Sequence, residues 1–271
     1  MQLDRIIIYF FLYSIIGYIS EVIYCSFPLK RFVNRGFLHG PYLPIYGFGA
    51  LIVLSSFSGI KELPLLVFFL AMISTSVLEY LTSYLLETLF HAKLWDYSKN
   101  FGNIRGRVCL LNSTLFGIMG VVVLYGVHPL VVNLVSMIPQ VVLQPVSKVI
   151  LVSLCVDTTS SVVRMTSFQK QLSEFKRKGK ELEERIELIR VQGASASLDA
   201  LRAKFDVERE EMKLRLEQTS RHFLNAFPSI TSANEETRLQ FELLRMNFRD
   251  YRDRLKKSKN KLKQAAKNLH R

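Results

Sequence analysis

Residues 5–25 read RIIIYFFLYSIIGYISEVIYC, an apolar run in which Arg5 and Glu21 carry the only charges. A bilayer core requires about 20 mostly apolar residues from a helix that crosses it. The run is therefore expected to span a membrane. It starts without a basic leader and has no small-residue cleavage site, so we expect a retained span and not a signal peptide.

Apolar runs of similar length recur along the first 163 residues. They predict an all-α fold, a polytopic membrane helix bundle of about five spans. The further spans are expected at residues 42–60, 63–89, 108–127 and 146–163. Residues 129–144 contain Pro129 and Pro139, with Pro145 directly after them, and proline interrupts or kinks a helix. We expect this stretch to dip into the membrane or to lie on its outer interface.

Charge divides the chain into two parts. Residues 1–163 contain 10 Lys and Arg and 7 Asp and Glu, whereas residues 164–271 contain 26 and 16, so +10 of the net charge of +13 lies in the second part. This division excludes a single soluble globule. We predict a transmembrane domain at 1–163 and a basic cytoplasmic helical tail at 164–271. Cys25, Cys109 and Cys155 are odd in number and far apart, which excludes a disulfide framework.

The placement of Lys and Arg predicts the orientation, because cytoplasmic loops hold an excess of them. Three lie in residues 26–41 and four in 90–107, but none in 128–145. This pattern predicts an amino terminus outside, a cytoplasmic carboxyl terminus and an odd number of spans. We expect a multi-pass protein of the inner cell membrane.

Apolar residues of the tail recur at helical spacing, first at Phe168, Leu172 and Phe175 and again from Phe241, after a turn at Phe227–Pro228. This spacing predicts a helical hairpin or coiled coil. Such a tail would join copies into a homo-oligomer or dock a partner, and its basic residues would contact membrane lipids. Nucleic acid is a less favoured partner, because acidic residues are interspersed and no aromatic stacking pattern is present.

Ionisable residues inside membrane spans are costly, and they usually face the bundle interior and mark a functional path. With the predicted orientation, nearly all unusual polar residues fall near the cytoplasmic ends of the spans. We therefore predict an inward-facing polar pocket. Its candidate ligand-binding residues are Glu21, His39, Tyr46, Glu79, Glu87, Trp95, Asp96, Tyr97, Arg107 and Asn112.

Structural roles are open for several of these residues. Glu79 or Glu87 would fix helix packing by binding Arg107 or a hydroxyl group. Trp95 would belong to the aromatic belt of the membrane interface. A single His39 beside scattered carboxylates does not favour a metal site, so we predict no metal and no other cofactor.

Three motifs carry a resemblance to a known family. They are GPYLPIYGFG at 40–49, LWDYS at 94–98 and FGNIRGRVCL at 101–110. Through them, residues 5–163 resemble the bacterial membrane proteins known as putative ABC-transporter type IV, or ABC transporter permeases. Gly102 departs from the pattern, since Asn or a similar polar residue is expected there.

The resemblance implies a membrane protein of a transport system, with acids at positions such as Glu79 and Glu87. The chain has no GxxxxGK(S/T) phosphate loop and cannot itself be the ATPase. A separate ATPase subunit is therefore the partner that the resemblance implies.

The favoured function is a permease-like transport component whose pocket takes a polar solute or a lipid headgroup. An intramembrane enzyme acting on a lipid-linked substrate is an alternative, with Glu79 or Glu87 as general base. In that case His39 or Asp96 would be the acid, and Arg107 would hold phosphate. No obvious nucleophile is present, so an enzyme is less favoured. A membrane-anchored scaffold or sensor for the tail is the other alternative.

Overall fold

The computed structural model describes residues 2–30 and 32–191 and, beyond them, residues 215, 216, 223, 224, 226, 227, 230–232, 238, 241 and 242. Within these residues the fold is all-α, as predicted. Outside the helices, the described backbone pairs at two isolated bridges, Lys93 with Thr231 and Ile104 with Val108.

The chain divides into two compact units. One comprises Met1–Arg164 together with Asn225–Thr231, and the other comprises Met165–Leu224 and Ser232–Arg271. The first unit thus contains a short segment of the tail besides the apolar helices. The cavities described below lie within this first unit.

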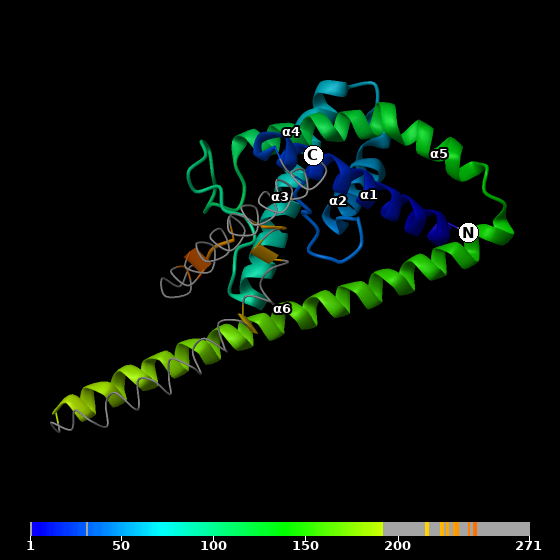
Figure 1. Cartoon of the computed structure of the whole chain (residues 1–271). Coiled ribbons are helices and arrows are strands. Elements are labelled where there is room, and N and C mark those ends of the chain that lie inside the picture. Colours follow the sequence, from blue (N-terminus) through cyan, green and yellow to red (C-terminus); the bar gives the residue numbers. More distant parts are fainter. Residues whose placement is uncertain are drawn as a thin grey trace, which may run out of the picture. The chain divides into compact units, whose positions relative to one another are not determined.

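Six α-helices follow one another within residues 2–191. They are α1 (Gln2–Leu29), α2 (Pro44–Phe57), α3 (Pro64–Phe90), α4 (Leu110–Val122), α5 (His128–Ser136) and α6 (Gln140–Val191). Pro44 and Pro64 stand in the first turns of α2 and α3, where the missing N–H of proline breaks no hydrogen bond. A 3-10 turn, Ser58–Ile60, extends α2. Figure 1 shows α6 as one long, continuous helix.

Among the described residues, four helical stretches are long and apolar enough to cross a membrane. They are Leu3–Phe27, Pro64–Phe90, Leu110–Ser136 and Gln140–Phe175, and a shorter apolar stretch runs over Pro44–Ile60. Large apolar side chains remain exposed along them, such as Leu85 and Val149, as expected for helices that face lipid. The predicted polytopic bundle is confirmed with four to five spans, and the chain is a multi-pass membrane protein.

The prediction for 129–144 is wrong for the residues up to Ser136. There α4 continues through a π turn, Val123–Val127, into α5. The N–H of His128 bonds to the carbonyl of Val123, one residue further back than in an α-helix. This wider turn directly precedes Pro129, which has no N–H to donate. The chain therefore stays helical up to Ser136, and the fourth span is longer than predicted.

Close packing of α1 on α2 depends on glycine. A Cβ atom on Gly17 would overlap the side chain of Tyr46, and one on Gly47 would overlap Ser14. Small residues at such contacts let helices in a membrane approach closely. The approach matters for function, because it brings Tyr46 next to Glu21, which lies one turn beyond Gly17.

In the second unit, three aromatic rings pack together. The ring centroid of Phe168 lies 6.0 Å from that of Phe223 and 6.1 Å from that of Phe241. All three side chains are fully buried. The hairpin or coiled coil predicted for the tail falls mostly outside the described residues and stays a prediction.

Replacing Gly17 by Val is expected to lower the free energy of unfolding by about 1–3 kcal/mol, since a close-packed contact becomes overpacked. Thermal unfolding of the purified protein in detergent measures the loss. Gly59→Val is the matched control, because no atom lies within 4 Å of a Cβ placed there. Equal melting temperatures for both variants would contradict this account of the α1–α2 contact.

Candidate functional site

A polar cavity lies at the end of the bundle where α1 and α3 finish and where α2 and α4 begin. Its volume is about 420 Å³, within the range of about 300–1,000 Å³ that is usual for small-molecule sites. Four helices and the loop between α3 and α4 contribute to its wall. The charged, polar and aromatic lining residues are Ser20, Glu21, Tyr24, Arg35, Tyr46, Glu79, Trp95, Tyr97, Asn100, Asn112, Phe116 and Phe227.

Glu21 of α1 is held by partners from several segments. The Nη2 atom of Arg35 lies 3.1 Å from Glu21 Oε1, and the hydroxyl of Tyr46 on α2 donates to Glu21 Oε2 at 2.6 Å. Arg35 Nη1 also donates to the carbonyl of Ala226 at 3.1 Å. Its guanidinium lies 5.5 Å from the ring centroid of Phe227, within cation–π range. Arg35 is thus committed to groups of the protein itself.

Glu79 of α3 differs from Glu21. The residue is only 4% exposed, and its Oε2 atom has no hydrogen-bond partner within the described residues. The side chain of Tyr97 interacts with the same carboxyl group. Burial, together with the charges of Glu79 and Glu21, raises the pKa of Tyr97 well above its usual value, so this phenol stays protonated.

The unpartnered oxygen of Glu79 indicates what the cavity can bind. A buried polar atom without a hydrogen bond costs about 1–3 kcal/mol, more if the group is charged. A ligand that brings a donor or a positive charge would remove this cost. Glu79 is therefore the point of the wall best suited to contact a ligand.

Glu87 and Arg107 form an ion pair that attaches the loop at 91–109 to α3. Arg107 Nη2 donates to Glu87 Oε2 at 2.6 Å, and Nη1 donates to the hydroxyl of Tyr80 at 3.0 Å. Burial by itself lowers the pKa of Arg107. The hydrogen bonds to Glu87 and Tyr80 outweigh this effect and raise the pKa above its usual value, so the guanidinium stays charged. The indole Nε1 of Trp95 donates to the carbonyl of Arg107 at 3.0 Å, so this pair also positions Trp95 in the cavity wall.

Asp96 stabilises a tight turn in the same loop. Its Oδ1 atom accepts a hydrogen bond from the N–H of Ser98 at 3.0 Å. The N–H of Tyr97 donates to the carbonyl of Gly106 at 2.8 Å. Gly106 has a φ of +70°, which favours glycine, and a Cβ atom there would overlap Asp96. The turn fixes the backbone from which Tyr97 reaches the cavity.

His39 lies in a separate contact with Asp157 of α6. The carboxylate of Asp157 accepts hydrogen bonds from the N–H groups of His39 and Gly40, both at 2.9 Å, and from the hydroxyl of Tyr42 at 2.5 Å. Nδ1 of His39 lies 2.8 Å from the same carboxylate. Burial and the bond to Asp157 raise the pKa of Tyr42. This contact attaches the loop between α1 and α2 to α6.

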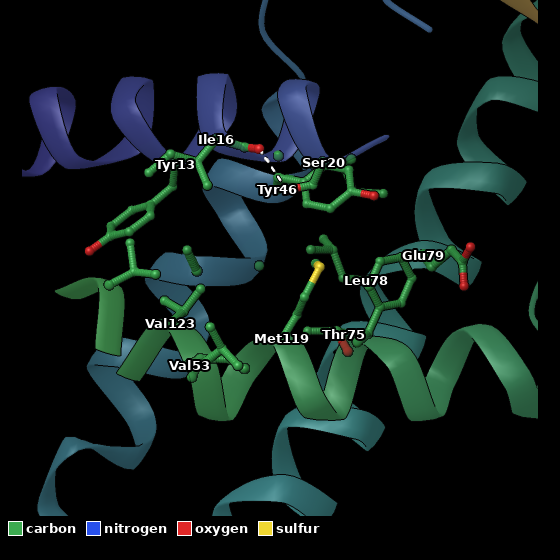
Figure 2. A pocket seen from close by; sticks show the side chains of 18 residues that line it. Tyr13, Ile16, Ser20, Tyr46, Val53, Thr75, Leu78, Glu79, Met119 and Val123 are labelled. Atoms are coloured by element: carbon green, nitrogen blue, oxygen red, sulfur yellow. Dashed lines mark hydrogen bonds between the residues drawn. The ribbon is translucent and has the colours of Figure 1, made fainter. Parts of the chain in front are cut away.

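A second, apolar cavity lies next to the polar one. Its volume is about 230 Å³, and its wall comes from α1, α2, α3 and α4 and from the π turn. Figure 2 shows Glu79 at one end of it and Tyr13 and Val123 at the other, with Met119 and Thr75 between them. The two cavities share the lining residues Ser20, Ile45, Tyr46, Glu79, Phe116 and Met119. They are therefore adjacent, and Tyr46 and Glu79 stand at their junction.

Comparison with known families gives one match. Residues 8–162 match the family described as putative ABC-transporter type IV. The chain belongs to this family. The match covers more than half of the sequence and includes all the helices that line the cavities. Comparisons with curated proteins and with solved structures gave no match.

Family membership and the apolar helices fit a membrane protein related to transport. Within the described part of this family member, no three His, Cys, Asp or Glu side chains are grouped so that they could hold a metal ion.

The ten residues predicted to bind a ligand do not all line one cavity. The polar cavity brings together Glu21, Tyr46, Glu79, Trp95, Tyr97 and Asn112. The other four do not line it. Glu87 and Arg107 pair with each other, Asp96 holds its turn, and His39 contacts Asp157.

Sequence reasoning missed six of the charged, polar and aromatic residues of the cavity wall, namely Ser20, Tyr24, Arg35, Asn100, Phe116 and Phe227. Arg35 counted only as a loop charge, and Phe227 only as part of a turn. Both are placed by contacts with residues distant in sequence, because the guanidinium of Arg35 binds the carbonyl of Ala226 and lies over the ring of Phe227. No local pattern in the sequence signals such contacts.

The ion pair of Glu87 with Arg107 gives a prediction for the loop at 91–109. Glu87→Gln is expected to speed cleavage by trypsin after Lys99 and Arg105 by roughly tenfold, because a weakened bond to a buried charge costs about 1.5 kcal/mol or more. Gel electrophoresis of the digested protein measures the rate. The exposed Glu62→Gln variant should be cleaved like the wild type. Equal rates for all three proteins would show that the pair does not hold the loop.

Proposed function

We propose that this chain is a permease-like component of a transport system in the inner membrane, and that its polar cavity binds a polar solute or a lipid headgroup from the cytoplasmic side. The observation that carries the proposal is the buried Glu79 oxygen without a partner, in the wall of a cavity of about 420 Å³. Ionisable residues inside a membrane protein usually mark a substrate path.

The distribution of basic residues supports a cytoplasmic opening. The loop between α1 and α2 supplies Arg35 to the cavity, and the loop between α3 and α4 supplies Trp95, Tyr97 and Asn100. These two loops hold the Lys and Arg residues that favour the cytoplasmic side. The amino terminus would then be outside and the tail inside the cell.

A separate ATPase subunit fits the family and the lack of a phosphate loop in this chain. The basic tail is a suitable region for assembly with such a subunit or with a second copy of the chain. Its excess of Lys and Arg would also contact anionic lipid headgroups.

The contacts of individual residues favour transport over intramembrane catalysis. An enzyme would need Glu79 or Glu87 near an acid such as His39 or Asp96, with Arg107 free to hold phosphate. Arg107 is instead bound to Glu87 and Tyr80. His39 is bound to Asp157.

Native mass spectrometry of the protein extracted gently from its own membrane tests the proposal. A bound solute or lipid is expected on the wild type and on the control Glu62→Gln, and it should be lost from Glu79→Gln, because Glu79 lines the cavity and Glu62 does not. An ATPase that stays bound to all three proteins would support the transport system. The same bound masses on all three proteins, without an ATPase, would contradict the proposal.

A further inference from the structure

We infer that the polar and apolar cavities together form one site for an amphiphile that carries an ammonium head and a single apolar chain. The inference rests on the proposed function and specifies its ligand. The head would lie in the polar cavity, beside Glu79, and the chain would extend from there into the apolar cavity.

The adjacency of the two cavities is the first argument. Six residues line both, and among them Tyr46 and Glu79 come from different helices that face each other at the junction. A ligand that occupied only the polar cavity would leave an apolar space of about 230 Å³ beside it. Apolar cavities of about 150 Å³ already bind guests such as benzene and exclude water. The space next to Glu79 thus suits an alkyl chain.

The charge of the polar cavity is the second argument. Its wall holds two carboxyl groups, Glu21 and Glu79, and one guanidinium, Arg35. Arg35 is already bound to Glu21 and to the carbonyl of Ala226. An anionic head would have to break these bonds, whereas a cationic head finds the Glu79 oxygen without a partner.

The aromatic content of the wall is the third argument. Tyr24, Tyr46, Trp95, Tyr97, Phe116 and Phe227 all line the polar cavity. Aromatic faces attract ammonium groups, and several faces around one carboxylate are a common way to recognise them. The same faces offer nothing comparable to a phosphate or a sulfate.

The chain provides its own reporter, because Trp95 is the only tryptophan and lines the polar cavity. The protein in nanodiscs of zwitterionic lipid would be titrated with 3-bromododecylammonium, whose bromine lies close to the head and quenches tryptophan fluorescence on contact, and the comparison ligands carry bromine on the same carbon. Bromododecyl sulfate, bromododecanol and the short bromopropylammonium serve as comparison ligands. An excess of unbrominated dodecylammonium separates saturable binding from partition into the lipid.

Two variants test the two ends of the site. Glu79→Gln replaces the carboxyl group next to the head by an amide. Gly49→Leu fills the apolar cavity, which Gly49 lines, and a Cβ there meets Leu78 and Thr75 at an ordinary 3.8 Å. Gly59→Leu is the matched control outside both cavities, with no atom within 4 Å of its Cβ.

We expect bromododecylammonium to quench Trp95 saturably in the wild type and in Gly59→Leu. Its affinity should fall at least about tenfold in Gly49→Leu, since displacing even two methylene groups from an apolar cavity has an effect of this size. A fall of at least about tenfold is also expected in Glu79→Gln, because this variant lacks the carboxyl group beside the head. Bromopropylammonium should bind more weakly to the wild type and should be affected by Glu79→Gln only. The comparison of chain lengths in the wild type tests the inference even if Gly49→Leu does not fold.

Each contrary result has its own meaning. Equal affinities for bromopropylammonium and bromododecylammonium would overturn the amphiphile and leave the proposed site for a polar solute intact. If bromododecyl sulfate or bromododecanol bound as tightly as bromododecylammonium, the ammonium head would be overturned and a lipid headgroup would remain as the ligand. No saturable quenching by any probe would overturn the inference, whereas the proposed function is decided by the masses bound to the wild type and to Glu79→Gln.

Discussion

The carboxylate of Glu21 is the point at which the cavity end of the bundle is held together. It lies on α1, accepts a hydrogen bond from Tyr46 on α2 and pairs with Arg35 in the loop between these helices. Arg35 extends the network to Ala226 and Phe227 of the tail. Removing one partner of a partly buried ion pair is costly, because the other charge is left uncompensated. The close approach of α1 and α2 at Gly17 makes this network geometrically attainable.

The ionisable residues around this end differ in one respect that matters for function. Glu21, Glu87 and Asp157 each have protein partners, which are Arg35, Arg107 and His39 together with neighbouring donors. Their contacts attach loops to helices and so shape the cavity. Glu79 alone among these acids keeps a buried oxygen without a hydrogen bond in the described structure. The contacts of the first three suit a structural role, and the fourth is our candidate for ligand binding.

The sequence is informative where a local physical rule applies. The apolar runs predict the membrane helices, because lipid requires long apolar stretches. The rule that proline interrupts a helix fails at Pro129, because a π turn directly before it accommodates the proline and the helix continues to Ser136. The pairing of Glu87 with Arg107 was left open as a structural alternative, and the structure contains it. The roles of Arg35 and Phe227 depend on contacts between distant residues, which no local pattern encodes.

A cryo-electron-microscopy map of the protein in nanodiscs of its native lipids, enlarged by a bound antibody fragment, tests the central claim most directly. The claim is that Glu79 faces an occupied site at the junction of the two cavities. The account predicts density that belongs to no residue of the chain, in contact with the Glu79 carboxyl group and between Tyr46 and Phe116. A map in which a side chain of the protein binds both oxygens of Glu79, with the cavity closed around it, would contradict the account.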